Sequence, residues 1–165
     1  MGRSHLALIA LLLAAPAFAQ EPVGCDKFKW PLDRERTMLA NPTVVASGSE
    51  VQQPLAAAMM VTLVPFADAN LPMAPSRAPK SPDSYAGFVR VSALPRAATY
   101  RITLSEGAWI DVVQDGYDVK SGAFSGAMGC DGVRKSVKFE LTAAPFIIEL
   151  SGTTAHAVAL VVTPD

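Results

Sequence analysis

DVVQDGYD, residues 111–118, carries the clearest turn signal in the sequence. Asp115-Gly116 separates two runs rich in β-forming residues, and Asp-Gly is a preferred pair in type I′ turns, which need positive φ at both central positions. Folding the chain here sets Asp111 opposite Lys120, a cross-strand pair of opposite charge. We therefore predict a two-residue β-hairpin at this point.

The same stretch has three aspartates beside a glycine, which raises the alternative of a metal-binding loop. A calcium loop of the EF-hand type needs oxygen ligands at alternating positions, glycine at the sixth position and glutamate at the twelfth. Counted from Asp111, these positions hold Val113, Gly116 and Gly122. Only the glycine fits, so the spacing favours the hairpin and predicts no metal site.

The sequence on both sides of this hairpin is also rich in short β-forming runs. In 99–104 the side chains of Tyr100, Ile102 and Leu104 alternate with polar ones and are expected to face inward, with Thr103 outward. Regular strands with little intervening helix predict an all-β fold, an antiparallel β-sandwich that is jelly-roll-like. The predicted strands are 85–92, 99–104, 109–114, 117–124, 133–141, 146–150 and 157–163.

One predicted strand combines core and charged residues on the same face. In 133–141 alternation sets Ser136 on the polar face. The opposite face takes Val133, Lys135, Val137, Phe139 and Leu141.

Two earlier segments are less regular. Leu55 to Val64 is almost wholly apolar, which fits a strand buried on both faces or a short core helix, and its Val-Thr-Leu-Val end favours the strand. Residues 20–41 form an N-terminal arm, with a short helix expected from Pro31 because proline is favourable in a first turn. The domain that follows spans 42–165.

The first residues have the features of a secretory signal peptide. Arg3 precedes an apolar run from Leu6 to Ala15, and Ala17-Phe18-Ala19 has the pattern of a cleavage site. We expect residues 1–19 to be removed by the general export route, which leaves a periplasmic protein or one secreted to the medium. No later stretch is long and apolar enough to predict a transmembrane segment.

The two cysteines, Cys25 and Cys130, both follow the predicted cleavage site. A pair of thiols in an oxidising compartment is usually a disulfide, so we predict that they are bonded. The alternative, a lipid anchor on Cys25, requires this cysteine to follow the apolar run directly, and residues 20–24 intervene.

The composition does not support the familiar catalytic or metal-binding sets. His156 is the one histidine beyond residue 19. A structural zinc site usually requires four Cys or His ligands, and the non-haem iron site requires two histidines and a carboxylate. Gly122-Ala-Phe-Ser-Gly126 places its serine one position late for a nucleophile elbow. The glycine-rich segment 122–132 is instead interpreted as a flexible turn that brings Cys130 to its partner. We expect no catalytic residue, metal or cofactor, and with a net charge of −1 and no charged block, no nucleic-acid partner.

The proline-rich loop, residues 71–84, is the main candidate for binding. Prolines at 72, 75, 79 and 82 prevent it from pairing in a sheet or sustaining a helix. Its cations and the neighbouring aromatic residue are suited to an anionic or sugar ligand, and the alternative is a solvated connector. Trp30 and Trp109 are interpreted as core residues first. The candidate ligand-binding residues are Arg77, Lys80, Ser81 and Tyr85.

The runs GFVRV, TYRITL, WIDVVQDG, SVKFEL, FIIEL and VALVVTP give the second half of the chain a resemblance to known modules. In pattern and order they resemble the pre-peptidase C-terminal and carbohydrate-binding-like β-sandwich modules of secreted bacterial enzymes. That resemblance implies a non-catalytic role in binding or stability.

The whole chain, with GCDKFKWPL, LPMAPSRAPKSPDSYAGF and WIDVVQDG, also resembles a group of short exported proteobacterial proteins of unknown function. Some of them carry a homogentisate 1,2-dioxygenase label. Such ring cleavage requires two histidines and a carboxylate on iron, which His156 alone does not supply, so we interpret the label as a misannotation.

These observations favour a non-catalytic periplasmic β-sandwich that binds a small molecule, glycan or protein partner through the proline-rich loop. One alternative is an enzyme, either a carboxylate-based hydrolase using residues such as Asp111 and Asp131 or a metal-dependent oxidoreductase formed by oligomerisation. A further alternative is an envelope structural or stress factor without a small ligand.

Overall fold

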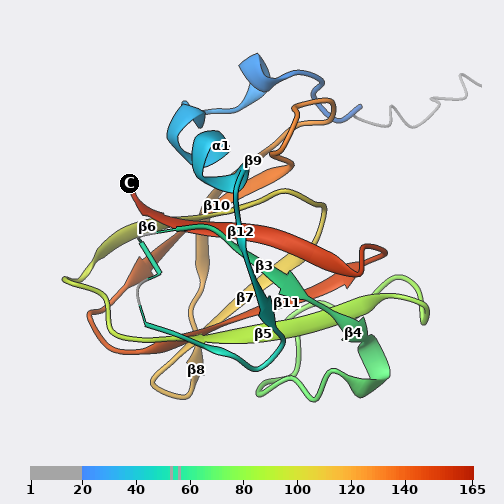
Figure 1. Ribbon diagram of the computed structural model, residues 1–165, viewed down its shortest axis with the longest axis vertical. Helices are drawn as coiled ribbons and strands as arrows, with labels where there is room; N and C mark the ends of the chain where they lie inside the picture. The colour runs from blue at the N-terminus through green and yellow to red at the C-terminus, as the bar shows by residue number, and fades with distance from the viewer. Residues whose placement is uncertain (1–19, 53, 56) are drawn as a thin grey trace, which may run out of the picture.

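Two β-sheets pack face to face in this computed structural model, which describes residues 20–52, 54–55 and 57–165 (Figure 1). The predicted signal peptide, residues 1–19, lies outside the described residues. The first sheet has the order β1 (Thr43–Ala46), β3 (Met59–Thr62), β12 (Ala157–Pro164), β6 (Ala98–Leu104), β10 (Lys135–Leu141) and β9 (Ser121–Gly126). The second has the order β2 (Glu50–Val51), β5 (Tyr85–Val91), β11 (Phe146–Thr153), β7 (Trp109–Gln114) and β8 (Tyr117–Asp118), and β4 (Val64–Pro65) also pairs with β5.

The fold is therefore the predicted all-β sandwich. Its strand pairs are antiparallel except β1 with β3 and β2 with β5, which are parallel. Besides α1 (Asp33–Leu39), the described residues form only the short 3₁₀ helices η1 (Cys25–Lys27) and η2 (Phe66–Asp68). Among these helices none is long and apolar enough to cross a membrane.

The main core lies between the two sheets and is built by the alternation that the sequence predicts. Tyr100, Ile102 and Leu104 of β6 are all buried there, as expected. Their neighbours in the core come from both sheets and include Val61, Val89, Val137, Phe139, Ile148, Leu150 and Leu160.

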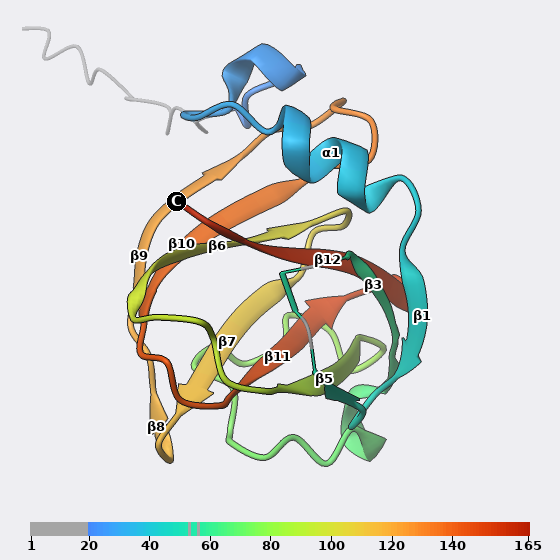
Figure 2. The same cartoon turned by 60° about the vertical axis from the view of Figure 1, so that its left-hand side comes forward.

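A second, smaller core lies on the outer side of the first sheet, where the N-terminal arm and α1 cover it (Figure 2). Leu32 and Leu39 pack there against Val161 of β12. The arm also buries Thr103 and Ser136, whose hydroxyl groups are 2.8 Å apart. Both side chains lie on the outer face of the sheet, as alternation predicts, but they are buried there because the arm covers a face that strand alternation alone leaves to solvent.

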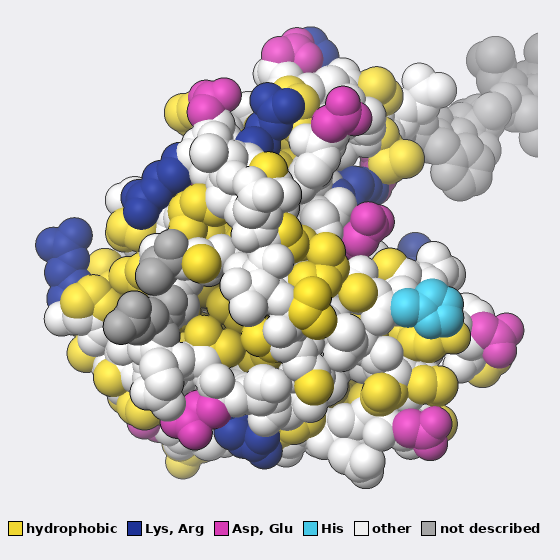
Figure 3. Space-filling model, viewed as in Figure 1, with side chains coloured by type: hydrophobic (Ala, Val, Ile, Leu, Met, Phe, Trp, Pro, Cys, Tyr) yellow, Lys and Arg dark blue, Asp and Glu magenta, His cyan; other side chains and the backbone are white. Residues whose placement is uncertain are grey.

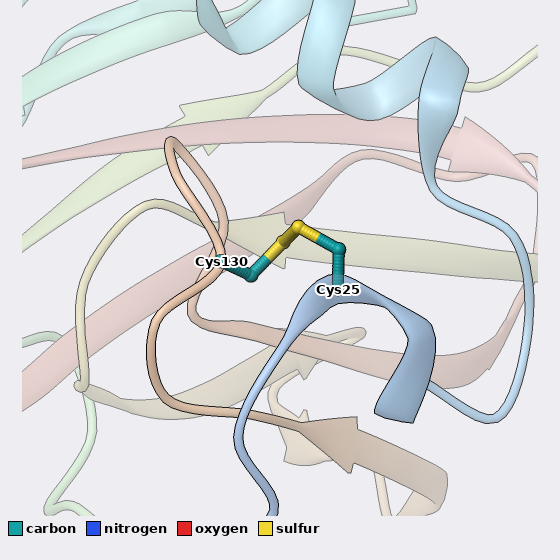
Figure 4. Close-up of a disulfide and its surroundings, with 2 residues drawn as sticks. All are labelled: Cys25 and Cys130. Atoms are coloured by element: carbon teal, nitrogen blue, oxygen red, sulfur yellow. A yellow bond between two sulfur atoms is a disulfide. The ribbon is translucent and has the colours of Figure 1, made fainter.

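The arm is fastened to the sandwich at both ends. The predicted disulfide joins Cys25 of η1 to Cys130, which precedes β10 (Figure 4). At the other end, the buried carboxylate of Glu35 accepts a hydrogen bond of 2.6 Å from the Thr163 hydroxyl and lies 3.4 Å from the Arg101 guanidinium. These contacts fix α1 against β12 and β6.

The hairpin at Asp115-Gly116 is confirmed, with φ of 55° and 81° and with Val113 opposite Asp118. The predicted partner of Asp111 is wrong. In the described part of the chain Asp111 forms no ion pair with Lys120, because regular pairing of β8 ends at Asp118, and its carboxylate binds the proline-rich loop instead.

Three predicted segments differ from the structure. The predicted strand 117–124 is two strands in different sheets, because the chain leaves the second sheet after β8 and crosses to the first as β9. The segment 122–132 is not only a turn, since its first five residues belong to β9. The predicted strand 55–64 is also divided, because β3 in the first sheet ends at Thr62 and Val64 begins β4, which pairs with β5 of the second sheet.

Candidate binding groove

A groove of about 550 Å³ opens between the first and second sheets at the side of the sandwich formed by β9 and β7. Figure 2 shows these strands in the two layers, with β9 at the left-hand edge. The groove opens here because β8 covers only the C-terminal end of β7, so Trp109 to Asp111 have no strand beside them on this side among the described residues. A smaller cavity of about 250 Å³ adjoins it and shares Trp109, Ile110 and Ser121.

The indole of Trp109 lines the groove and is contacted by two cations. The Arg77 guanidinium carbon lies 4.7 Å from its ring centroid, and the Lys135 Nζ lies 4.8 Å from it. Both distances are within the range of cation–π attraction. The Lys135 Nζ also donates a hydrogen bond of 3.0 Å to the Ala108 carbonyl, which holds this side chain in place.

The groove is locally positive. Arg134, which also lines it, pairs with Glu21 of the arm, whereas Arg77 and Lys135 have no carboxylate within ion-pair distance in the described ranges. Burial, and then the charges of Arg134 and Arg77, lower the pKa of Lys135, while Asp111 raises it by a smaller amount. An anion placed among these cations offsets their mutual repulsion. Figure 3 shows charges of both signs scattered over the face of the molecule that it presents.

Phe124 of β9 supplies a second aromatic wall. It is 61% exposed, and the Lys29 Nζ lies 5.1 Å from its ring centroid. Across the groove from Trp109 it provides apolar surface beside the cations, a combination typical of sites that bind ligands with a charged and an apolar part.

Asp111 fixes the proline-rich loop and thereby places Arg77 in the groove. Its carboxylate accepts hydrogen bonds from the Ser76 hydroxyl at 2.5 Å, from the Ser76 amide at 3.3 Å and from the Trp109 indole N–H at 3.1 Å. The same indole N–H lies 2.8 Å from the Ser76 hydroxyl oxygen. Ser76 immediately precedes Arg77, so this cluster sets the position of the guanidinium over the ring.

Glu149 fixes the loop at a second point, because it is the cross-strand neighbour of Asp111. Its Oε1 accepts a hydrogen bond of 2.8 Å from the Met73 amide. The side chain is buried, and its Oε2 has no hydrogen-bond partner in the described structure. Burial raises the pKa of this carboxyl, the Met73 hydrogen bond opposes that rise, and the charges of Asp111 and Asp118 add to it.

The structure brings one of the four predicted ligand-binding residues into the groove, namely Arg77. Tyr85 begins β5, where its ring lies 4.2 Å from the ring of His156, centroid to centroid. Ser81 is used within the loop and accepts a hydrogen bond from the Asp83 amide, and Lys80 is exposed. These three residues do not line the groove.

The two carboxylates of the enzyme alternative lie on separate elements. Asp111 is on β7 beneath the proline-rich loop, and Asp131 is exposed in the turn beside the disulfide. The hydrogen bonds of Asp111 hold the loop in place, which gives this carboxylate a structural role. Within the described ranges no group of three or more His, Cys, Asp and Glu side chains is placed to hold a metal ion.

Sequence reasoning missed most of the groove. It assigned Trp109 to the core and gave no role to Arg134 or Phe124. One signal was present, because Lys135 falls on the same face of its strand as Val137 and Phe139. A lysine in a row of apolar side chains indicates that the row reaches solvent there, because lysine buries its stem and keeps its charged end in water.

No protein-family model matches this chain, and no curated protein or solved structure matches it.

Proposed function

We propose that this chain is an exported, non-catalytic binding protein of the periplasm, and that its ligand is anionic and lies in the groove between β9 and β7. The observation that carries the proposal is the convergence of Arg77 and Lys135 on the Trp109 ring, where neither cation has a carboxylate within ion-pair distance among the described residues. Holding such cations together costs free energy unless a ligand of opposite charge binds between them.

The chemistry of the groove wall supports a ligand with both a charged and an apolar part. An arginine guanidinium binds carboxylate, sulfate or phosphate oxygens in a planar fork, and an indole face stacks on a ring or an aliphatic segment. Glu21 of the arm is an internal example of the charged contact, since its carboxylate pairs with Arg134 at the mouth of the groove.

The location is part of the proposal and rests on the sequence pattern of residues 1–19, with the disulfide as a supporting feature. Expression of the full chain in a Gram-negative host tests it. We expect the protein in the periplasmic fraction with Gln20 as its first residue. Recovery of the intact chain from the cytoplasm contradicts the proposed location and leaves the groove chemistry to be tested separately.

Binding is tested by the fluorescence of Trp109 in a Trp30→Phe background, in which Trp109 is the remaining tryptophan. The probes are benzoate, glucuronate and inorganic phosphate. We expect at least one to change the emission with saturation, and Arg77→Ala to weaken that probe about tenfold through loss of a charged hydrogen bond.

The matched control for this experiment is Arg96→Ala, which removes an exposed cation from the segment between β5 and β6, outside the groove. It should leave probe affinity unchanged. The proposal is overturned if no probe binds, or if Arg77→Ala and Arg96→Ala have equal effects.

A further inference from the structure

The outer edge of β9 borders the groove and is open to another strand. β9 is the last strand of the first sheet, so in the described structure one of its two edges has no strand partner. Its sequence SGAFSG contains neither charge nor proline, and its first four residues are exposed. Natural sheets usually protect such edges with charged residues, proline or a covering segment. Over Ser121–Phe124 the strand itself has neither charge nor proline, and the Lys29 Nζ of the arm lies beside it, 5.1 Å from the Phe124 ring centroid.

The chain's own arm shows how an extended segment binds along the same edge. Just beyond β9, Val23 pairs with Met128 in a parallel bridge. The Gly24 amide donates to the Met128 carbonyl at 2.8 Å, and the Met128 amide donates to the Pro22 carbonyl at 2.8 Å. The residue that precedes Pro22 is Glu21, whose carboxylate pairs with Arg134. An extended acidic segment is therefore already bound by backbone pairing together with a charge contact.

The remaining edge and the remaining cations lie next to this contact. Ser121, Phe124 and Gly126 of β9 line the same groove as Arg77 and Lys135. Side chains alternate along a strand, so every second side chain of a strand added to β9 points toward the groove and the others point away. Acidic side chains at the groove-facing positions would meet Arg77 and Lys135, which have no ion-pair partner in the described part of the chain.

We propose that the ligand of the groove is an extended segment of an acidic polypeptide, which adds to β9 as a further strand of the first sheet. This inference rests on the proposed function and narrows its ligand to a polypeptide. A glycan or a small anion would satisfy the cations but would leave the backbone N–H and C=O groups of the β9 edge unused. A polypeptide uses both features at once, as in strand addition to an exposed sheet edge.

The test uses a fluorescently labelled synthetic peptide of about eight residues that alternates glutamate and valine, a length that suits one strand. Two control peptides have the same length. One carries lysine in place of glutamate, and the other is methylated at its backbone nitrogens and cannot donate backbone hydrogen bonds. Binding is followed by fluorescence anisotropy, and amide exchange of β9 is followed by NMR.

We expect the glutamate peptide to bind and both control peptides to bind at least tenfold more weakly. Amides of β9 that exchange rapidly in the free protein should become protected in the complex. Arg77→Ala and Lys135→Met should each weaken binding roughly five- to tenfold, because each removes one charged contact. Arg96→Ala should leave it unchanged. Met is chosen at 135 because it retains an apolar stem beside Trp109.

Other results separate this inference from the proposed function. Equal binding of the methylated peptide with unchanged β9 exchange overturns strand addition and leaves anion binding in place. Binding of benzoate, glucuronate or phosphate without binding of the peptide likewise overturns strand addition and leaves anion binding in place. Protection of β9 without peptide, together with a doubled mass in sedimentation, assigns the edge to a second copy of this chain and overturns the inference. Failure of every probe and peptide overturns both proposals.

Discussion

The fold favours the protonated form of the Glu149 side-chain carboxyl. Because burial raises its pKa, the folded chain binds this proton more tightly than the unfolded chain does. The resulting stabilisation is complete below the unfolded pKa, near 4.5, and is lost as the pH rises through the folded pKa. We therefore expect Glu149→Gln, which retains an acceptor for the Met73 amide, to gain stability relative to the native chain as the pH rises. Urea unfolding at about pH 4.5 and about pH 8 measures this change.

The control for Glu149 is Glu106→Gln, since Glu106 is exposed in the short segment between β6 and β7. Its stability relative to the native chain should be the same at both pH values. A Glu149→Gln variant whose offset from the native chain does not change with pH would show that the buried carboxyl does not titrate differently in the two states.

Single residues also mark how far the sequence could predict this molecule. Alternation placed Tyr100 and Ile102 in the core correctly, because inward and outward positions follow from strand geometry alone. It did not predict the burial of Thr103, because burial on the outer face depends on where the arm docks. Arg77 was identified because it carries a charge on a proline-rich loop. Lys135 was not identified, because the sequence alone does not show which row of inward-facing side chains reaches the groove.

At the scale of elements, the proline-rich loop is held by side chains rather than by strand pairing, and Asp111 is its principal anchor. Asp111→Ala removes the acceptor of both Ser76 hydrogen bonds, which should lower the free energy of unfolding by about 1–3 kcal/mol. The loop should then be cleaved faster by trypsin after Arg77 and Lys80, as followed by mass spectrometry under native conditions.

Asp118→Ala, which removes an exposed carboxylate on β8, is the control and should be cleaved at the native rate. Equal rates for all three proteins would mean that other contacts hold the loop.

Turn chemistry is local, and this explains which elements the sequence could predict. Asp115 and Gly116 specify the β7–β8 hairpin by their backbone preferences, and β5, β6 and β7 follow from β-forming runs. The split of 117–124 into β8 and β9 could not be predicted in this way, since nothing in that run marks the point where the chain changes sheets. The groove exists because of that crossing, so the sequence predicted the sandwich and not the groove.

At the scale of the whole molecule, the arm connects the stability of the sandwich to the shape of the groove. Gln20, Glu21 and Pro22 line the groove mouth, while the disulfide a few residues later holds this part of the arm against the segment after β9. The contacts of Glu35 hold the distal part of the arm over the first sheet. Loss of the disulfide should therefore loosen the groove mouth before it disturbs α1.

Replacing both cysteines tests this connection. The bond closes a loop with a sequence separation of 105, for which chain entropy predicts a loss of about 4–5 kcal/mol on removal, and measured losses are typically about 2–5 kcal/mol. We expect the variant with Cys25→Ala and Cys130→Ala to lose stability in that range in guanidinium unfolding. Amide exchange at Gly24 and Met128 should accelerate more than exchange in α1, because the Val23–Met128 bridge lies beside the missing bond. Native protein treated with a reductant should show the same pattern of amide exchange. Equal acceleration of exchange along the whole arm would instead mean that the disulfide and the Glu35 contacts act as one unit.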